Sequence, residues 1–93
     1  MAKSINQSLR TAFSKKQNIK IKYYSLSSDE VKWRIISIYK LENDFLIGYC
    51  HLRKDERTFV KDRIRNAIIQ KEKYEIPKKW RPKSNVWSSR RFK

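Results

Sequence analysis

The sequence predicts a mainly β fold, in which one N-terminal helix precedes five short antiparallel strands. Three observations support this prediction: one amphipathic stripe near the N-terminus, alternation of apolar and polar residues in the segments that follow, and short polar connections between these segments. Five closely connected antiparallel strands are typical of a small barrel or a half-open sheet, and composition does not choose between the two. The 93 residues suffice for one small domain.

The predicted helix covers residues 4–16. Ser4 can act as its N-cap, and Gln7 follows three residues later, which is the spacing of a capping box. Asn18 would end the helix. Four apolar residues fall on one helical face: Ile5, Leu9, Ala12 and Phe13.

Five strands are predicted after the helix, over residues 19–24, 31–41, 45–52, 57–61 and 64–70. In the second strand, alternation separates one face, with Val31, Trp33, Ile35 and Tyr39, from another, with Lys32, Arg34, Ile36, Ile38 and Lys40. We expect the hydrophobic core to contain Ile21, Trp33, Ile35, Leu46, Phe59 and Ile64.

The residue patterns that most enzymes and metal sites require are missing from the sequence. Its single glycine excludes a P-loop and a dinucleotide-binding fingerprint, and there is no carboxylate pair and no Cys/His cluster. Cys50 is expected to be a small buried apolar residue. The sequence therefore predicts no catalytic residue, no metal and no cofactor, and we expect the protein not to be an enzyme.

The charge points to an anionic partner. Twenty-four Lys and Arg residues against nine acidic residues give a net charge of +15, whereas solubility of a small domain needs roughly 2–8 units. Such a basic chain is typical of a nucleic-acid-binding protein. Since no apolar run is long enough to span a membrane and no signal peptide is recognisable, we expect a cytoplasmic location.

Residues 77–93 form a distinct tail with seven basic residues, three aromatic residues and no acidic residue. Basic side chains interleaved with aromatic rings suit phosphates and exposed bases, so we expect the tail to contact nucleic acid. A solvated tail, packing of Trp80 and Trp87 on the domain, and an oligomer contact are the alternatives. The candidate tail residues are Lys78, Lys79, Trp80, Arg81, Trp87, Arg90 and Arg91.

One segment resembles the centre of a WYL domain. It reads Phe45-Leu46-Ile47-Gly48-Tyr49-Cys50-His51-Leu52-Arg53 and, after a polar turn, continues with Arg57, Phe59, Asp62, Arg63 and Ile64. The sequence departs from the family pattern at Ile38, where the family has proline, and at Asp44-Phe45-Leu46, which replaces Trp-Tyr-Leu. The resemblance implies an SH3-like or Sm-like barrel over residues 18–76, between an N-terminal helix (1–17) and the tail (77–93).

The resemblance also implies a function in ligand sensing or nucleic-acid binding. Members usually carry a helix-turn-helix domain in front, whereas this sequence shows a single helix there, so we expect a stand-alone or appended module.

The family's ligand groove is basic, and the matching positions supply candidate ligands. Arg34, Arg57 and Arg63 would hold phosphate, because guanidinium groups donate two parallel hydrogen bonds to it. Tyr49 would stack on a base. An ion pair of Asp62 with Arg63 or Arg57 is the structural alternative. The other candidates in the domain are His51, which alternation puts on the same side as Tyr49, Arg53 and Lys61.

The sequence thus predicts a non-catalytic regulatory module that binds single-stranded DNA or RNA, or a nucleotide-type ligand. Its 12 aromatic residues favour base stacking over the reading of a duplex groove. Two other functions stay open: a module that binds an acidic protein partner, and a small basic endoribonuclease with His51 as acid or base. A homodimer is also left open, and no membrane partner is expected.

Overall fold

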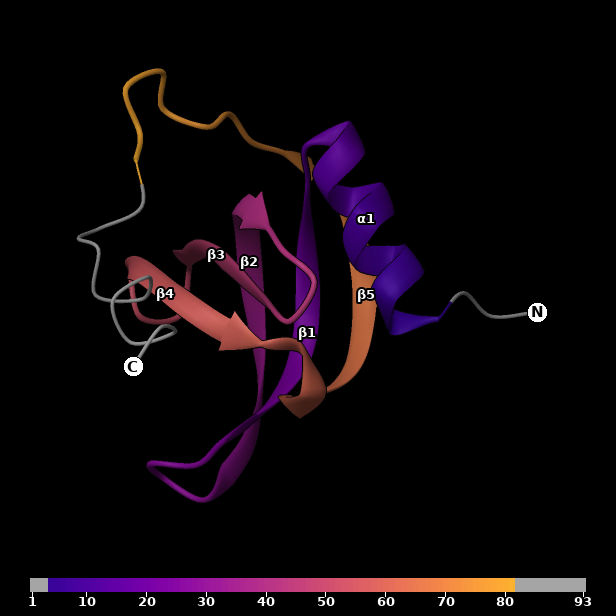
Figure 1. The fold of residues 1–93 in the computed structure, drawn as a ribbon, viewed down its shortest axis with the longest axis vertical. Helices are drawn as coiled ribbons and strands as arrows, with labels where there is room; N and C mark the ends of the chain where they lie inside the picture. The colour runs from indigo at the N-terminus through magenta and orange to yellow at the C-terminus, as the bar shows by residue number, and fades with distance from the viewer. Residues whose placement is uncertain (1–3, 82–93) are drawn as a thin grey trace.

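The computed structural model describes residues 4–81, which form one helix packed on one antiparallel sheet (Figure 1). The elements follow in the order α1 (Ile5–Lys15), β1 (Gln17–Ser25), β2 (Glu30–Leu41), β3 (Phe45–Cys50), β4 (Asp55–Val60), the 3-10 turn η1 (Lys61–Arg63) and β5 (Ile64–Lys73). The predicted helix and the five predicted strands are confirmed. No helix within the described part of the chain is long and apolar enough to cross a membrane.

The sheet is open, which corrects the predicted closed barrel. Its strand order is β4-β3-β2-β1-β5, so β4 and β5 are the two edges. The turn η1 carries the chain from one edge to the other, and it leaves these strands without a ladder between them. The Tyr23 hydroxyl on β1 accepts a hydrogen bond from Val60 N at the end of β4 (3.0 Å). A side-chain contact, and not strand pairing, therefore joins the end of β4 to β1.

The helix α1 begins at the predicted capping box. Ser4 Oγ accepts a hydrogen bond from Gln7 N (3.1 Å), and Ser4 N donates to Gln7 Oε1 (3.1 Å). The helix stops at Lys16, which adopts the left-handed conformation with φ 56°. Leu9 and Ala12 are completely buried and meet the core-facing side of the sheet.

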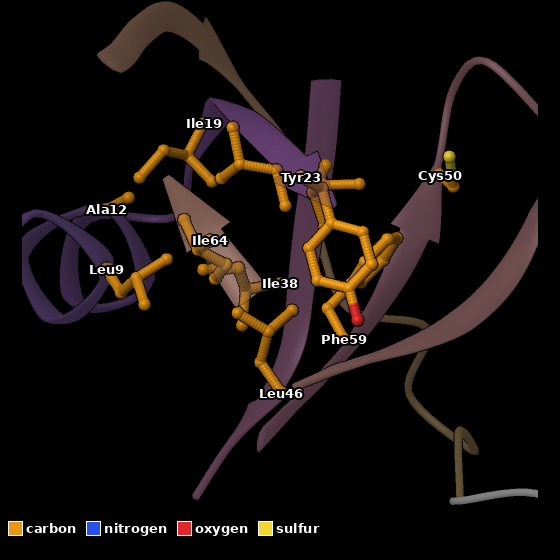
Figure 2. Close-up of a cluster of buried hydrophobic side chains, with 11 residues drawn as sticks. Leu9, Ala12, Ile19, Tyr23, Ile38, Leu46, Cys50, Phe59 and Ile64 are labelled. Atoms are coloured by element: carbon orange, nitrogen blue, oxygen red, sulfur yellow. The ribbon is translucent and has the colours of Figure 1, made fainter. Parts of the chain in front are cut away.

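The hydrophobic core fills the space between α1 and this face of the sheet (Figure 2). Tyr23 and Phe59 meet edge to face, with ring centroids 4.9 Å apart. Four of the predicted core residues are confirmed as buried: Ile21, Leu46, Phe59 and Ile64.

The predicted core face of β2 is wrong. Trp33 and Ile35 are 39% and 37% exposed, whereas Ile36 and Ile38 are completely buried. The even-numbered residues Ile36 and Ile38 therefore fill the core, and the odd-numbered residues Trp33 and Ile35 face outward.

A β-bulge at Tyr39 also interrupts the alternation of β2 beyond Ile38. Ile38 pairs with Gly48, but on the far side of Tyr39 it is Leu41 that pairs with Leu46. A bulge adds one unpaired residue to a strand, so the core-facing positions change there from even to odd numbers. Leu41 packs against the core accordingly.

Gly48 allows β2 and β3 to approach each other closely. A Cβ atom at this position would lie 2.6 Å from Ser37 O and 2.7 Å from Ile36 Cγ2. No side chain fits there, which gives a physical reason for the glycine in the strand motif.

The hairpin formed by β1 and β2 extends beyond the other strands (Figure 1). The ladder of β1 with β5 ends at Tyr23, and the ladder of β2 with β3 ends at Ile36. Farther out, the two strands pair only with each other, and Tyr24 Oη donates a hydrogen bond to Asp29 Oδ1 near the turn (2.7 Å). The candidate site residues lie on both faces of the sheet near this hairpin, some on the core-facing side and some on the outer side.

Candidate anion-binding pocket

A pocket of about 290 Å³ lies on the core-facing side of the hairpin, between the hairpin, β4 and η1. The aromatic pair Tyr23 and Phe59 contributes to its wall. Its polar lining comes from three arginines and three hydroxyl side chains: Arg34, Arg57, Arg63, Ser25, Ser27 and Thr58. The pocket therefore offers hydrogen-bond donors and positive charge, and none of its lining residues is acidic.

Strand alternation explains why the three arginines meet. Arg34 lies two residues before buried Ile36 on β2, and Arg57 lies two residues before buried Phe59 on β4, so both point to the core-facing side. Arg63 is the last residue of η1, which carries the chain along the same side. Residues from three elements thus converge on one pocket.

Arg34 is the most unusual of the three. Its side chain is only 5% exposed, and its Nε atom is enclosed without a hydrogen-bond partner. Its Nη1 donates to Cys50 Sγ at 3.8 Å, and a thiol sulfur is a weak acceptor. No ion pair neutralises this guanidinium among residues 4–81. Because arginine stays protonated in proteins, a buried charge here is left without a counter-charge.

The other two arginines are more accessible. Arg57 is exposed and Arg63 is half-buried. The predicted alternative, an ion pair of Asp62 with either of them, does not occur in the described part of the chain. Arg57 and Arg63 are thus open to an anion that enters the pocket, and Arg34 forms part of the pocket wall.

Tyr49 and His51 lie together, as alternation predicts, but on the opposite face of the sheet from Arg34. Their rings meet edge to face with centroids 5.1 Å apart. Ser37 Oγ donates a hydrogen bond to Asn18 Oδ1 (2.5 Å), so His51 Nε2 must donate to the same hydroxyl (2.9 Å). The Ser37 proton is directed away from the histidine, so this pair is not arranged as a nucleophile and its base.

Comparison with known proteins gives the same family that the motif suggested. The WYL domain matches residues 4–69. The chain belongs to the WYL domain family. No curated protein sequence matches it.

A solved structure resembles the fold of this WYL domain. Proteasome accessory factor B/C (PafBC) of Arthrobacter aurescens superposes with a TM-score of 0.77 and 17% sequence identity over 87% of the present chain. The match covers 14% of the PafBC chain, so the WYL domain described here spans a small part of that protein's length. At this identity the likeness concerns the fold alone.

Lys61 lies apart from the arginine pocket of the WYL domain. It lines a second pocket, between α1 and the end of β4, and its Nζ donates to Asn6 Oδ1 (3.1 Å). Burial lowers the pKa of Lys61 below the usual lysine value, and the positive charge of Arg10 lowers it further. Arg53 is exposed in the turn between β3 and β4.

The described part of the tail packs partly on the outer face of the sheet. Trp80 Nε1 donates to Glu56 Oε2 (2.7 Å), and its ring lies 5.3 Å from that of Tyr39. Packing of Trp80 on the domain, one of the predicted alternatives, is therefore observed. Lys78, Lys79 and Arg81 are exposed. Trp87, Arg90 and Arg91 lie outside the described residues.

Sequence reasoning missed two groups of polar or exposed residues around the hairpin. The hydroxyls of Ser25 and Ser27 lie 3.2 Å apart at the pocket, and no pattern in the sequence marks these two serines as site residues. Trp33 was assigned to the core, although it alternates with Arg34 and pairs with Lys22 on β1. This pairing comes from the register of the folded hairpin, and a lysine directly opposite a core tryptophan would also face the core.

Proposed function

We propose that this WYL domain is a non-catalytic regulatory module whose arginine pocket holds the phosphate of a single-stranded nucleic acid or of a nucleotide-type ligand. The observation that carries the proposal is Arg34, a buried guanidinium with an enclosed, unpartnered Nε. Burying an N–H group without a partner costs about 1–3 kcal/mol, and a charged group costs more. Such a feature is understandable if a ligand completes it.

The composition of the pocket favours phosphate over other anions. Three guanidinium groups can each present two parallel donors, and phosphate has enough oxygens to accept from several of them at once. The hydroxyls of Ser25, Ser27 and Thr58 add neutral donors at the rim. A small carboxylate would leave most of these donors unpaired.

The volume of the pocket limits how much of a ligand it can enclose. A volume of about 290 Å³ lies just below the usual range for ligand pockets, which is about 300–1,000 Å³. We therefore infer that the phosphate and its adjoining sugar enter, and that the base and any further nucleotides remain outside. This arrangement suits both a free nucleotide and a strand that passes the pocket.

Family membership supports a regulatory, cytoplasmic role without catalysis. The series of one helix, four strands, a 3-10 turn and a fifth strand supports the further proposal that the open sheet is a variant of the SH3-like or Sm-like barrel.

Nucleotide titration tests the pocket. A nucleoside monophosphate and its unphosphorylated nucleoside are added to the intact protein, to Arg57→Met and to Lys71→Met, and binding is followed by thermal shift and calorimetry. We expect the intact protein and Lys71→Met to bind the monophosphate only, and Arg57→Met to bind at least tenfold more weakly. Equal binding by all three proteins, or equal binding of nucleoside and monophosphate, would refute the proposal. Tight binding of poly-glutamate alone would favour the acidic-partner alternative.

A further inference from the structure

The outer face of the hairpin carries a second group of exposed residues, opposite the arginine pocket. Lys22 pairs with Trp33 and Lys20 pairs with Ile35, so the four side chains lie on the same side of β1 and β2. We call these four residues the lysine–tryptophan strip. The core-facing arginine Arg34 is the chain neighbour of Trp33, and its side chain points to the other side.

The strip is open to solvent. Trp33 and Ile35 are more than one-third exposed, and Ile68 of β5, which pairs with Lys20, is about half exposed. The helix α1 covers the other face of the sheet. Trp80 packs farther along the outer face, next to Tyr39 and Glu56, and leaves the tryptophan of the strip exposed. Three large apolar side chains are therefore exposed on a part of the sheet that no other element of residues 4–81 covers.

Positive charge surrounds the exposed indole ring. The Nζ atoms of Lys20 and Lys22 lie 5.5 and 5.9 Å from the centroid of the Trp33 ring. Neither lysine forms an ion pair within residues 4–81. The two residues are separated by about 7 Å along the strand, so they present two separate charges beside one aromatic surface.

This surface continues toward the neighbouring strand β3. His51 N donates a hydrogen bond to Ile35 O (3.0 Å), which places the histidine beside the strip. The hydrogen bond from His51 to Ser37 and the edge-on ring of Tyr49 hold the imidazole in place. The Tyr49–His51 ring pair thus lies next to Ile35 on the outer face.

We infer that the lysine–tryptophan strip binds the bases of a single-stranded nucleic acid, with Trp33 as stacking surface and Lys20 and Lys22 as phosphate ligands. Exposed aromatic rings with flanking basic groups are the combination that single strands use, because every base has a flat face and every linkage a negative charge. The inference takes from the proposed function only the class of partner. It assigns a site on the opposite side of the sheet.

Other occupants of this face are less compatible with its charge and shape. A second copy of the chain would bring another net charge of +15 and two more lysines against the same surface. An acidic peptide would pair with the lysines but would leave the flat indole without a matching group. A single strand satisfies both features at once.

Substitutions at Trp33 test the inference in the intact protein. A labelled 12-mer single strand of mixed sequence is titrated at low salt against the unsubstituted protein, Trp33→Ala and Trp33→Phe, with circular dichroism as a check on folding. We expect Trp33→Ala to bind about tenfold or more weakly, because it loses a base stack, and Trp33→Phe to retain most of the affinity. Tryptophan fluorescence quenching by the strand should fall in Trp33→Phe although binding persists.

The lysines provide an independent measurement. The double variant Lys20→Gln/Lys22→Gln should reduce the slope of log affinity against log salt by about 1.4, which is 0.7 for each phosphate that no longer meets a lysine. The double variant Lys71→Gln/Lys73→Gln, at the exposed end of β5, removes the same two charges and should leave the slope nearly unchanged. Should Trp33→Ala fail to fold, the lysine slope and the quenching comparison decide the question.

Affinity within twofold of the unsubstituted protein for both Trp33→Ala and the lysine pair would overturn the inference, as would a complete lack of strand binding by the unsubstituted protein. Nucleoside monophosphate binding, measured separately, reports on the arginine pocket. Binding of the monophosphate without binding of the strand would therefore support the arginine pocket and contradict nucleic-acid binding by the lysine–tryptophan strip.

Discussion

Replacing Arg34 by methionine should stabilise the fold and abolish phosphate binding at the same time. Methionine keeps an unbranched apolar stem of similar length and removes the buried charge. The gain comes from the enclosed Nε atom, since an unsatisfied buried donor costs about 1–3 kcal/mol. The hydrogen bond to Cys50 Sγ, which the substitution removes, is long at 3.8 Å, so its removal subtracts little.

Thermal unfolding followed by circular dichroism gives both quantities. For a domain of this size, 1 kcal/mol of stability shifts Tm by about 4–8 °C, so Arg34→Met should melt at least several degrees above the unsubstituted protein. A phosphate ligand at 100 times its Kd should stabilise the unsubstituted protein by about 2.7 kcal/mol, and should leave Arg34→Met unchanged.

Arg57→Met is the matched control, because this arginine lines the same pocket but is exposed. Its own effect on stability should remain within about 0.5 kcal/mol, while the stabilisation by phosphate should fall from about 2.7 to about 1.4 kcal/mol or less. An Arg34→Met protein that melts well below the unsubstituted one would show that Arg34 supports the fold, and would contradict a ligand-binding role for its unpartnered Nε.

Four further predictions concern the core, the close approach of two strands, a half-buried tyrosine and the tail. Phe59→Ala should cost about 3–5 kcal/mol in the free energy of unfolding, because the ring is buried against Tyr23; an unchanged denaturant midpoint would remove Phe59 from the core. Gly48→Ala should cost at least about 1–3 kcal/mol, since its Cβ would meet backbone at 2.6 Å, and equal stability would contradict the close approach of β2 and β3. Burial raises the pKa of Tyr74, whose hydroxyl donates to Ile38 O, so the unfolded chain loses this proton at a lower pH than the folded protein does. The stabilisation from the protonated Tyr74 should therefore be fully present below about pH 10 and decrease above it. In urea titrations across that range, the free energy of unfolding of Tyr74→Phe should decrease less steeply with pH than that of the unsubstituted protein. Truncation after Arg81 should weaken single-strand binding and flatten its salt slope by about 0.7 for each phosphate that the tail neutralises, whereas an identical slope would exclude the end of the tail from the interface.

Local features of this WYL domain were predictable from its sequence because they depend on near neighbours. The capping box of Ser4 and Gln7 requires only a three-residue spacing. The ends of the strands follow from short polar turns, and the buried Phe59 and Ile64 follow from alternation within single strands.

Features that depend on how strands meet were predicted less well. Closure of the barrel depends on whether β4 reaches β5, and no local pattern reports on that distance. Alternation correctly put Tyr49 and His51 on one side of β3. Their side relative to Arg34 depends on the pairing of β3 with β2, which the bulge at Tyr39 shifts.

The arginine pocket was likewise predictable only in part from the sequence. The motif and the family resemblance supplied Arg34, Arg57 and Arg63, and the structure brings all three together. The hydroxyls around them come from the hairpin turn and could be assigned only after folding.

The adjacency of Trp33 and Arg34 on opposite faces makes this domain sensitive to the length of β2. Trp33 and Arg34 are adjacent, and a shift of register by one residue moves every side chain of a strand to the other face. Deleting one residue between Arg34 and the bulge would thus turn the Trp33 ring toward the arginine pocket and the Arg34 guanidinium toward the lysine–tryptophan strip. The residues that β1 and β4 contribute to the two surfaces would stay where they are. Insertions and deletions in β2 of this chain are therefore expected to be tolerated far less than substitutions.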